Sequence, residues 1–250
     1  MEIYGNATTC NIERVLYQNI LLSDYYKSLH EYEEFDEIVD EIYNIVEHCE
    51  PWLGGNARGA SSAFCLLMRL TELKLEEGQI RKLVNHNDSP YIRALGFLYL
   101  RYCCNPRNLL GWFLPFLKDS EEIAPAQNGK TITVGVFCRD ILLDMNYFET
   151  LFPRIPVNVM KEIVGTLEQR GLPTKPLGNA GTGGGSRRGG EGSRPASVKA
   201  ALSVSMGQRA PNRGGGREAT EERQGGKDEN GGGGGGRDRR DHREDYDRRD

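Results

Sequence analysis

The chain has little of what marks membrane-spanning, secreted and metal-binding proteins. No window approaches the roughly 18 apolar residues that a membrane span needs, and no basic segment followed by an apolar run stands near residue 1. The 250 residues include 6 cysteines, and no two of them form a C-x-x-C pair. We therefore expect a soluble intracellular protein of a reducing compartment, without a bound metal or other cofactor.

The motifs of common enzymes are also missing. No G-x-S-x-G nucleophile elbow occurs, and in the segment 124–131, which partly resembles a phosphate-binding loop, Ala124 replaces the first glycine. That segment leads into β-branched residues, which predicts a turn before a strand. A hydrolase or transferase that uses Cys65 or His86 has no supporting constellation. We expect neither enzymatic activity nor a small-molecule substrate.

Composition divides the chain into two unlike parts. Apolar and aromatic residues crowd into residues 1–171, with 16 Lys+Arg against 24 Asp+Glu. Residues 172–250 are rich in glycine and charged residues, with 16 Lys+Arg against 12 Asp+Glu. Such a composition cannot bury enough apolar surface to offset the entropy lost on ordering. The sequence predicts a domain over residues 1–171 and a disordered tail over residues 172–250.

Helical periodicity runs through the first part. Apolar residues recur at helical spacing in eight segments, residues 11–22, 32–49, 62–75, 79–84, 90–102, 107–118, 136–145 and 157–169. Thr8 or Thr9 is the expected N-cap of the first helix, and Ser89 or Asp88 before Pro90 marks the clearest helix start. We expect residues 64–75 to form a central core helix. The predicted fold is a mainly α, compact multi-helix domain with at most a short β-hairpin near residues 130–134.

Five ordered blocks together form a more specific pattern than any single motif. They are DEIY at residues 40–43, EPW at 50–52, SAFCLL at 62–67, DSPYIRALGF at 88–97 and LFPRIPV at 151–157. The set closely resembles the pre-mRNA-splicing factor 38 family, and its B-type branch more than its A-type. The resemblance spans about residues 8–170.

That resemblance implies a nuclear, non-catalytic scaffold of the tri-snRNP or the precatalytic spliceosome, needed for spliceosome activation. The expected partners are helical or extended segments of other spliceosomal proteins. In the A-type branch they are a helix of a microfibril-associated-protein-like splicing factor and a zinc-finger splicing protein. We expect the protein to be monomeric outside the complex, and RNA to be contacted indirectly or weakly through the tail in a salt-sensitive way.

Seven residues are candidates for partner binding, because aromatic and arginine side chains carry much of the energy at protein interfaces. Some of the aromatic ones could instead seal the core. Arg93 and Arg101, on one helix, either pair with the acidic segment 32–49 or face a partner. In an alternative function, general RNA binding, a basic patch of Arg93, Arg101 and Arg154 acts with the Arg/Gly tail. The seven candidates are Trp52, Tyr91, Arg93, Arg101, Trp112, Phe152 and Arg154.

Overall fold

The computed structural model describes residues 1–54 and 59–177. The chain divides into two compact units, residues 1–190 and 191–250, and all described residues belong to the first. The tail predicted beyond residue 171 therefore lies, from residue 178 on, outside the described residues. Among the described residues no helix is long and apolar enough to cross a membrane.

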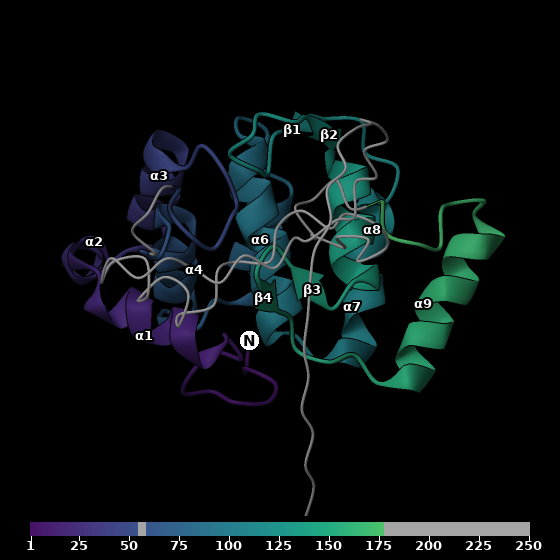
Figure 1. Cartoon of the computed structure of the whole chain (residues 1–250), viewed down its shortest axis with the longest axis horizontal. Helices are drawn as coiled ribbons and strands as arrows, with labels where there is room; N and C mark the ends of the chain where they lie inside the picture. Colours follow the sequence, from purple (N-terminus) through teal and green to yellow (C-terminus); the bar gives the residue numbers. More distant parts are fainter. Residues whose placement is uncertain (55–58, 178–250) are drawn as a thin grey trace, which may run out of the picture. The chain divides into compact units, whose positions relative to one another are not determined.

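The described part is mainly helical, as predicted, with two short antiparallel hairpins where at most one was expected (Figure 1). The helices are α1 (Arg14–Leu22), α2 (Asp24–Ser28), α3 (Phe35–Ile45), α4 (Ser62–Glu72), α5 (Glu77–Val84), α6 (Pro90–Cys103), α7 (Pro106–Phe113), α8 (Val134–Leu143) and α9 (Val157–Gln169), with 3-10 turns η1 (Leu29–Glu31) and η2 (Leu114–Phe116). The hairpins pair β1 (Glu122–Ile123) with β2 (Ile132–Thr133) and β3 (Asn146–Tyr147) with β4 (Thr150–Leu151).

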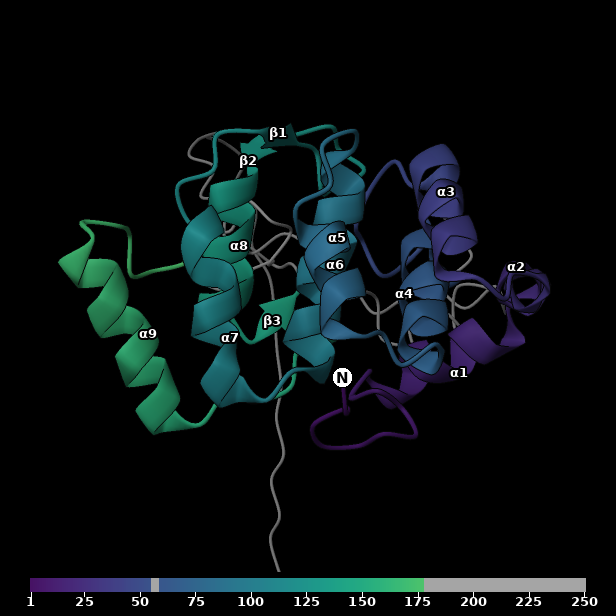
Figure 2. The ribbon, with the colours of Figure 1, turned by 180° about the vertical axis from the view of Figure 1, so that it is seen from behind.

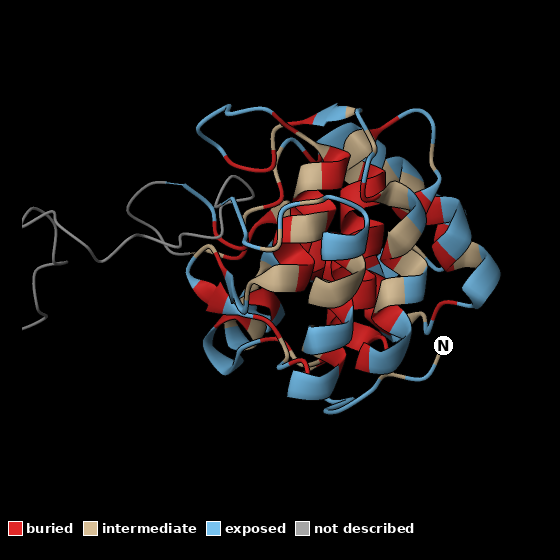
Figure 3. Cartoon of the chain, turned by 90° about the vertical axis from the view of Figure 1, so that its right-hand side faces the viewer, coloured by how far each residue is buried: buried red, intermediate tan, exposed pale blue. Residues whose placement is uncertain are grey.

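Helix α6 occupies the centre of the fold. It contacts α3, α4, α5, α7 and α8, and lies between α4 and α8 in both ribbon views (Figures 1 and 2). Every residue from Ile92 to Cys103 is buried, so the helix is covered on all sides. Figure 3 shows buried residues gathered in the interior and exposed ones on the outer helices and loops. Helix α4 is also largely buried, as expected for a core helix over residues 64–75.

Local capping chemistry sets several helix ends where the sequence predicted them. The Ser89 hydroxyl accepts a hydrogen bond from the Tyr91 amide, and Pro90 takes the first helical position of α6. The Ser61 hydroxyl caps α4 in the same way. Gly171, at a φ of 65°, closes α9, because a left-handed backbone lets its amide and the next one bond back to the last turn.

Helix α1 begins at Arg14, later than the Thr8 or Thr9 cap predicted for it. Cys10 and Asn11 both have positive φ, 51° and 59°, a conformation that cannot continue a right-handed helix. The Asn11 side chain holds this turn by donating hydrogen bonds to the Tyr4 and Tyr102 carbonyls, both at 2.7 Å. The expected cap is wrong because this turn, held in part by the distant Tyr102 carbonyl, determines the local backbone.

A glycine brings two helices close together beside α6. A Cβ on Gly96 would stand 2.9 Å from Cβ of Leu83, nearer than real Cβ atoms approach. The absence of a side chain at this position lets α5 pack tightly on α6. This contact holds α5 against the central helix, which α7 also contacts.

Candidate functional site

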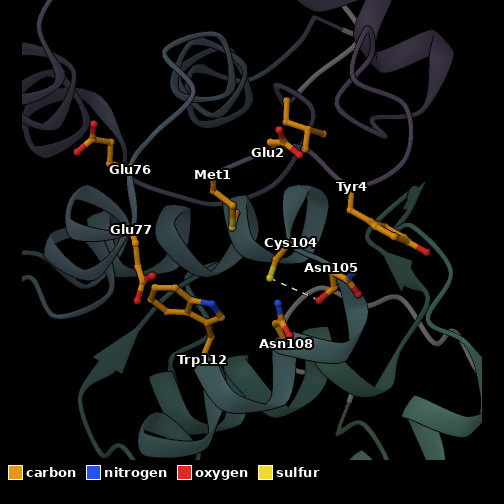
Figure 4. A pocket seen from close by; sticks show the side chains of 10 residues that line it. Met1, Glu2, Tyr4, Glu76, Glu77, Cys104, Asn105, Asn108 and Trp112 are labelled. Carbon is orange, nitrogen blue, oxygen red and sulfur yellow. Dashed lines mark hydrogen bonds between the residues drawn. The ribbon is translucent and has the colours of Figure 1, made fainter.

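The first candidate surface is a groove between the N-terminal segment, the start of α5 and α7, here called the Trp112 groove. Its volume is about 670 Å³, and Trp112 on α7 lines it with a half-buried side chain. Figure 4 shows the carboxylate of Glu77 beside the Trp112 indole, and the Met1 side chain directed into the same space. The remaining lining residues are Glu2, Ile3, Tyr4, Glu76, Cys104, Asn105 and Asn108.

The groove continues past the indole into a second space of about 610 Å³, which Trp112, Asn108 and Glu77 line as well. The Arg81 guanidinium lies over the Trp112 ring, with Cζ 4.8 Å from the ring centroid. It also donates to the Glu77 carboxylate at 2.6 Å. The ion pair and the cation–π contact both hold the indole in place at the junction of the two spaces.

Charge is distributed unevenly along this surface. Glu2 and Glu76 line only the first space, and Arg81 and Arg107 line only the second. Glu77, which is paired with Arg81, lines both. Asn105 caps α7 and Pro106 begins it, so the helix presents Asn108 and Trp112, four residues apart, on one face. The groove is thus an aromatic centre between an acidic end and a basic end.

A second surface, here called the Arg101 groove, joins three of the predicted residues. Arg101 near the end of α6, and Phe152 and Arg154 after β4, line a space of about 480 Å³ together with the turn at residues 4–13. Tyr4 and Cys104 line both this groove and the Trp112 groove, so the two meet there. Arg154 is exposed, whereas Arg101 and Phe152 are buried.

The Arg101 side chain is almost completely enclosed, at 3% exposure. Its Nε donates to the Ile141 carbonyl at 2.8 Å, in the last turn of α8, and Nη1 donates to the Pro153 carbonyl at 2.7 Å. The Phe152 ring lies 4.6 Å from Cζ. Burial lowers the pKa of Arg101 to about 10, which leaves the guanidinium charged at neutral pH. Arg101 therefore links α6, α8 and the segment after β4.

Arg93, at the other end of α6, is neutralised inside the domain. Its Nη1 and Nη2 form ion pairs with Glu121 and Asp119, and its Nε donates to the Val84 carbonyl at 3.1 Å. Burial raises the pKa of Asp119, but the hydrogen bonds from Arg93 and from the Glu121 amide lower it more, to a value below the usual range. The expected pairing with the acidic segment 32–49 is wrong, because the loop before β1 supplies both carboxylates.

Four of the seven candidates lie inside the domain. Trp52 and Phe152 are buried at 9% and 3% exposure, and Arg93 and Arg101 at 7% and 3%. Trp52 and Arg93 are enclosed within the fold, whereas Arg101 and Phe152 are buried but line the Arg101 groove. Partner binding by these four side chains stays a prediction. The three arginines of the RNA-binding alternative do not form a basic surface patch, because only Arg154 is exposed. Tyr91, Trp112 and Arg154 remain accessible, and their partner binding stays a prediction.

The described residues give no support for a reactive cysteine or for a metal site. All six cysteines are buried and free, and burial raises the pKa of Cys65 to about 11, although a Ser23 hydrogen bond opposes the shift. A thiol with a raised pKa is a poor nucleophile at neutral pH. No group of three or more His, Cys, Asp or Glu side chains in the described ranges is placed to hold a metal ion. The segment 124–131 precedes the short strand β2, as predicted.

Sequence reasoning missed the residues that complete the Trp112 groove. Tyr4 is bonded through its amide to the Cys103 carbonyl at 2.8 Å, so the first residues of the chain pass beside the end of α6. Glu76 and Glu77 lie between the predicted helices of residues 62–75 and 79–84, and no sequence motif gives them a role. No local pattern indicates that a segment some 75 residues earlier in the chain lies beside them. Tyr4 is 51% exposed in the structure, but nothing in the sequence distinguishes it from a core aromatic residue.

Comparison with known proteins identifies related chains. The PRP38 family model matches residues 1–165. The chain is 53% identical over 211 residues to Pre-mRNA splicing factor SR-like 1 of Arabidopsis thaliana, covering 84% of this chain and 53% of that protein. It is 41% identical over 201 residues to Pre-mRNA-splicing factor 38B of Homo sapiens, covering 72% of this chain and 37% of that protein. The chain thus spans about half or less of the length of these relatives.

A solved structure has a similar fold. A chain in the crystal structure of the Snu23-Prp38-MFAP1(217-258) complex of Chaetomium thermophilum superposes with a TM-score of 0.58 at 16% identity. The superposition covers 83% of this chain and 97% of that chain. At this identity the likeness establishes a shared fold.

Proposed function

This chain belongs to the PRP38 family, and on that premise we propose that it is a nuclear pre-mRNA-splicing factor that serves as a non-catalytic docking subunit. It binds segments of other splicing proteins within the tri-snRNP or the precatalytic spliceosome and is needed for activation of that complex. Two curated relatives are named as splicing factors, and the protein of similar fold was solved in a complex with Snu23 and an MFAP1 segment. The names of these relatives support a role in protein assembly.

The observation that carries the proposal is the Trp112 groove. A tryptophan held by flanking charges in an open groove is a typical interface hot spot, because it offers a large apolar surface at little entropic cost. The acidic end at Glu2 and Glu76 suits a basic partner residue, and the basic end at Arg107 suits an acidic one. We propose that the occupant is a helical or extended segment with an apolar side chain against Trp112.

Affinity purification of the full-length protein from nuclear extract tests this function. The tagged wild type and Trp112→Ala are purified side by side, and co-purifying proteins are quantified by mass spectrometry. We expect the wild type to recover spliceosomal proteins and Trp112→Ala to lose most of them, since a hot-spot residue contributes about 2 kcal/mol or more of binding free energy.

The matched control is Tyr43→Ala, which removes an aromatic side chain that is 57% exposed on α3, outside the groove. It should recover the same proteins as the wild type. Thermal unfolding of both variants shows whether they are folded. Equal recovery of spliceosomal proteins by a folded Trp112→Ala would exclude the Trp112 groove as the docking site, and recovery of no spliceosomal protein by the wild type would exclude the function.

A further inference from the structure

The Arg101 groove contains a buried charge that the described part of the chain does not neutralise. No carboxylate of the described residues forms an ion pair with the Arg101 guanidinium, and its only hydrogen-bond acceptors there are the two carbonyls of Ile141 and Pro153. The Nη2 donor makes no hydrogen bond in this part of the structure, although Arg101 lines the groove. Taking a charge out of water is costly unless an opposite charge compensates it.

A second cation, Arg154, and the N-terminus of α1 also favour an anion in the Arg101 groove. Arg154 lines the groove with an exposed side chain and forms no ion pair among the described residues. Ile12 and Glu13 also line it, directly before α1, a nine-residue helix whose N-terminus has no side-chain cap. The free amides of such a terminus favour an anion. Glu13, exposed at the rim, is the one carboxylate among the lining residues.

The walls beside these charges are apolar. Leu151, 50% exposed on β4, stands next in sequence to Phe152, and Leu109 of α7 and Ile12 line the same space. A free inorganic anion would gain nothing from such walls. A polypeptide segment gains from both, through one acidic side chain and an apolar neighbour.

We propose that the Arg101 groove binds an acidic segment of a partner protein, whose Asp or Glu carboxylate is received by Arg101 and Arg154 while an adjacent apolar side chain packs on Leu151 and Phe152. A single carboxylate compensates the buried guanidinium through its free Nη2 donor. A doubly charged phosphate suits the site less, because Glu13 stands at the rim. The inference goes beyond the proposed function, since it concerns a different groove and a defined ligand chemistry.

A peptide selection on the full-length protein tests the assignment. Random heptapeptides displayed on phage are selected on the wild type, with counter-selection on Arg154→Glu. We expect the selected peptides to share one Asp or Glu beside an apolar residue. Replacing that residue by Asn or Gln in a synthetic peptide should weaken binding about tenfold or more, because the buried guanidinium again lacks its counter-charge.

Three variants complete the test. Arg154→Glu and Arg101→Lys, each shown to be folded by thermal unfolding, should also weaken binding of the acidic peptide about tenfold or more. Arg170→Glu, which reverses an exposed arginine outside the groove, should leave binding unchanged.

Several results would overturn the proposal. They are recovery of no peptide, peptides without a shared acidic residue, unchanged binding by both groove variants, or a phosphoserine peptide that binds much more tightly than its Glu counterpart. None of these results bears on the Trp112 groove. Failure of the Arg101-groove proposal can therefore be distinguished from failure of the proposed docking function.

Discussion

The two ends of α6 differ in how the fold compensates a buried positive charge. Each carries a buried arginine, Arg93 near the start and Arg101 near the end, at 7% and 3% exposure. Arg93 meets two carboxylates, those of Asp119 and Glu121, and Arg101 meets two carbonyls. Both bonds of Arg101 are well formed, yet they supply partial charges in place of a full counter-charge.

The difference separates a structural arginine from one that is suited to binding. A closed ion-pair cluster such as that of Arg93 has its charge compensated inside the fold. The guanidinium of Arg101 remains under-compensated and lines a groove, so a ligand can supply what the fold lacks. Position on the same helix and similar burial therefore do not imply the same role.

Removing the compensated arginine should have the largest effect on stability. Arg93→Met leaves the carboxylates of Asp119 and Glu121 partly buried without a cation, which typically costs about 3–5 kcal/mol of unfolding free energy. Urea unfolding of the full-length protein measures the loss. The control Arg81→Met removes an arginine whose side chain is 64% exposed, and it should cost less than about 1 kcal/mol. Equal losses for the two variants would show that the Arg93 cluster does not stabilise the fold.

Removing the under-compensated arginine should cost less. Arg101→Met leaves two carbonyls without donors, at roughly 1–3 kcal/mol, but it also relieves the desolvation of an unpaired charge. Urea unfolding should therefore place Arg101→Met between the Arg93 and Arg81 variants. A loss as large as that of Arg93→Met would contradict the contrast between the two ends of α6.

Of the two ends of α6, only the Arg93 end should lose stability in acid, because among the described residues only its arginine is paired with carboxylates. The folded-state pKa of Asp119 lies below its ordinary value, so its contribution to stability is fully present above about pH 4 and is lost as the pH falls through the lower folded pKa. In Asp119→Asn this group no longer titrates, and the variant should lose less stability than the wild type on acidification below about pH 4. Urea midpoints recorded from pH 6 downward measure the difference, and parallel pH profiles would refute it.

The sequence predicted the helices more accurately than the surroundings of their side chains. Ser89 and Pro90 correctly predict the start of α6, because capping depends on neighbouring residues. The end of α7 is equally local, since Pro115 cannot continue the helix and the chain passes into η2. By contrast, α1 begins later than predicted because of the turn at Cys10 and Asn11, which a hydrogen bond to Tyr102, 91 residues away, helps to hold.

The candidate site was predicted only in part. Trp112 was chosen as an aromatic candidate for partner binding, and the structure places it in a groove. Arg101, Phe152 and Arg154 were chosen separately, yet they line one space. Whether each side chain faced solvent was beyond prediction, because burial depends on which elements pack against it.

By itself the sequence determined the class of the fold, the ends of its best-capped helices and the family, because periodicity, capping and ordered motifs are encoded in nearby residues. Only the tertiary structure decided how the two arginines of α6 differ. The carboxylates that neutralise Arg93 come from 26 and 28 residues away, and the carbonyls at Arg101 from 40 and 52. Whether a buried charge is compensated depends on such distant groups, and no local pattern carries that information.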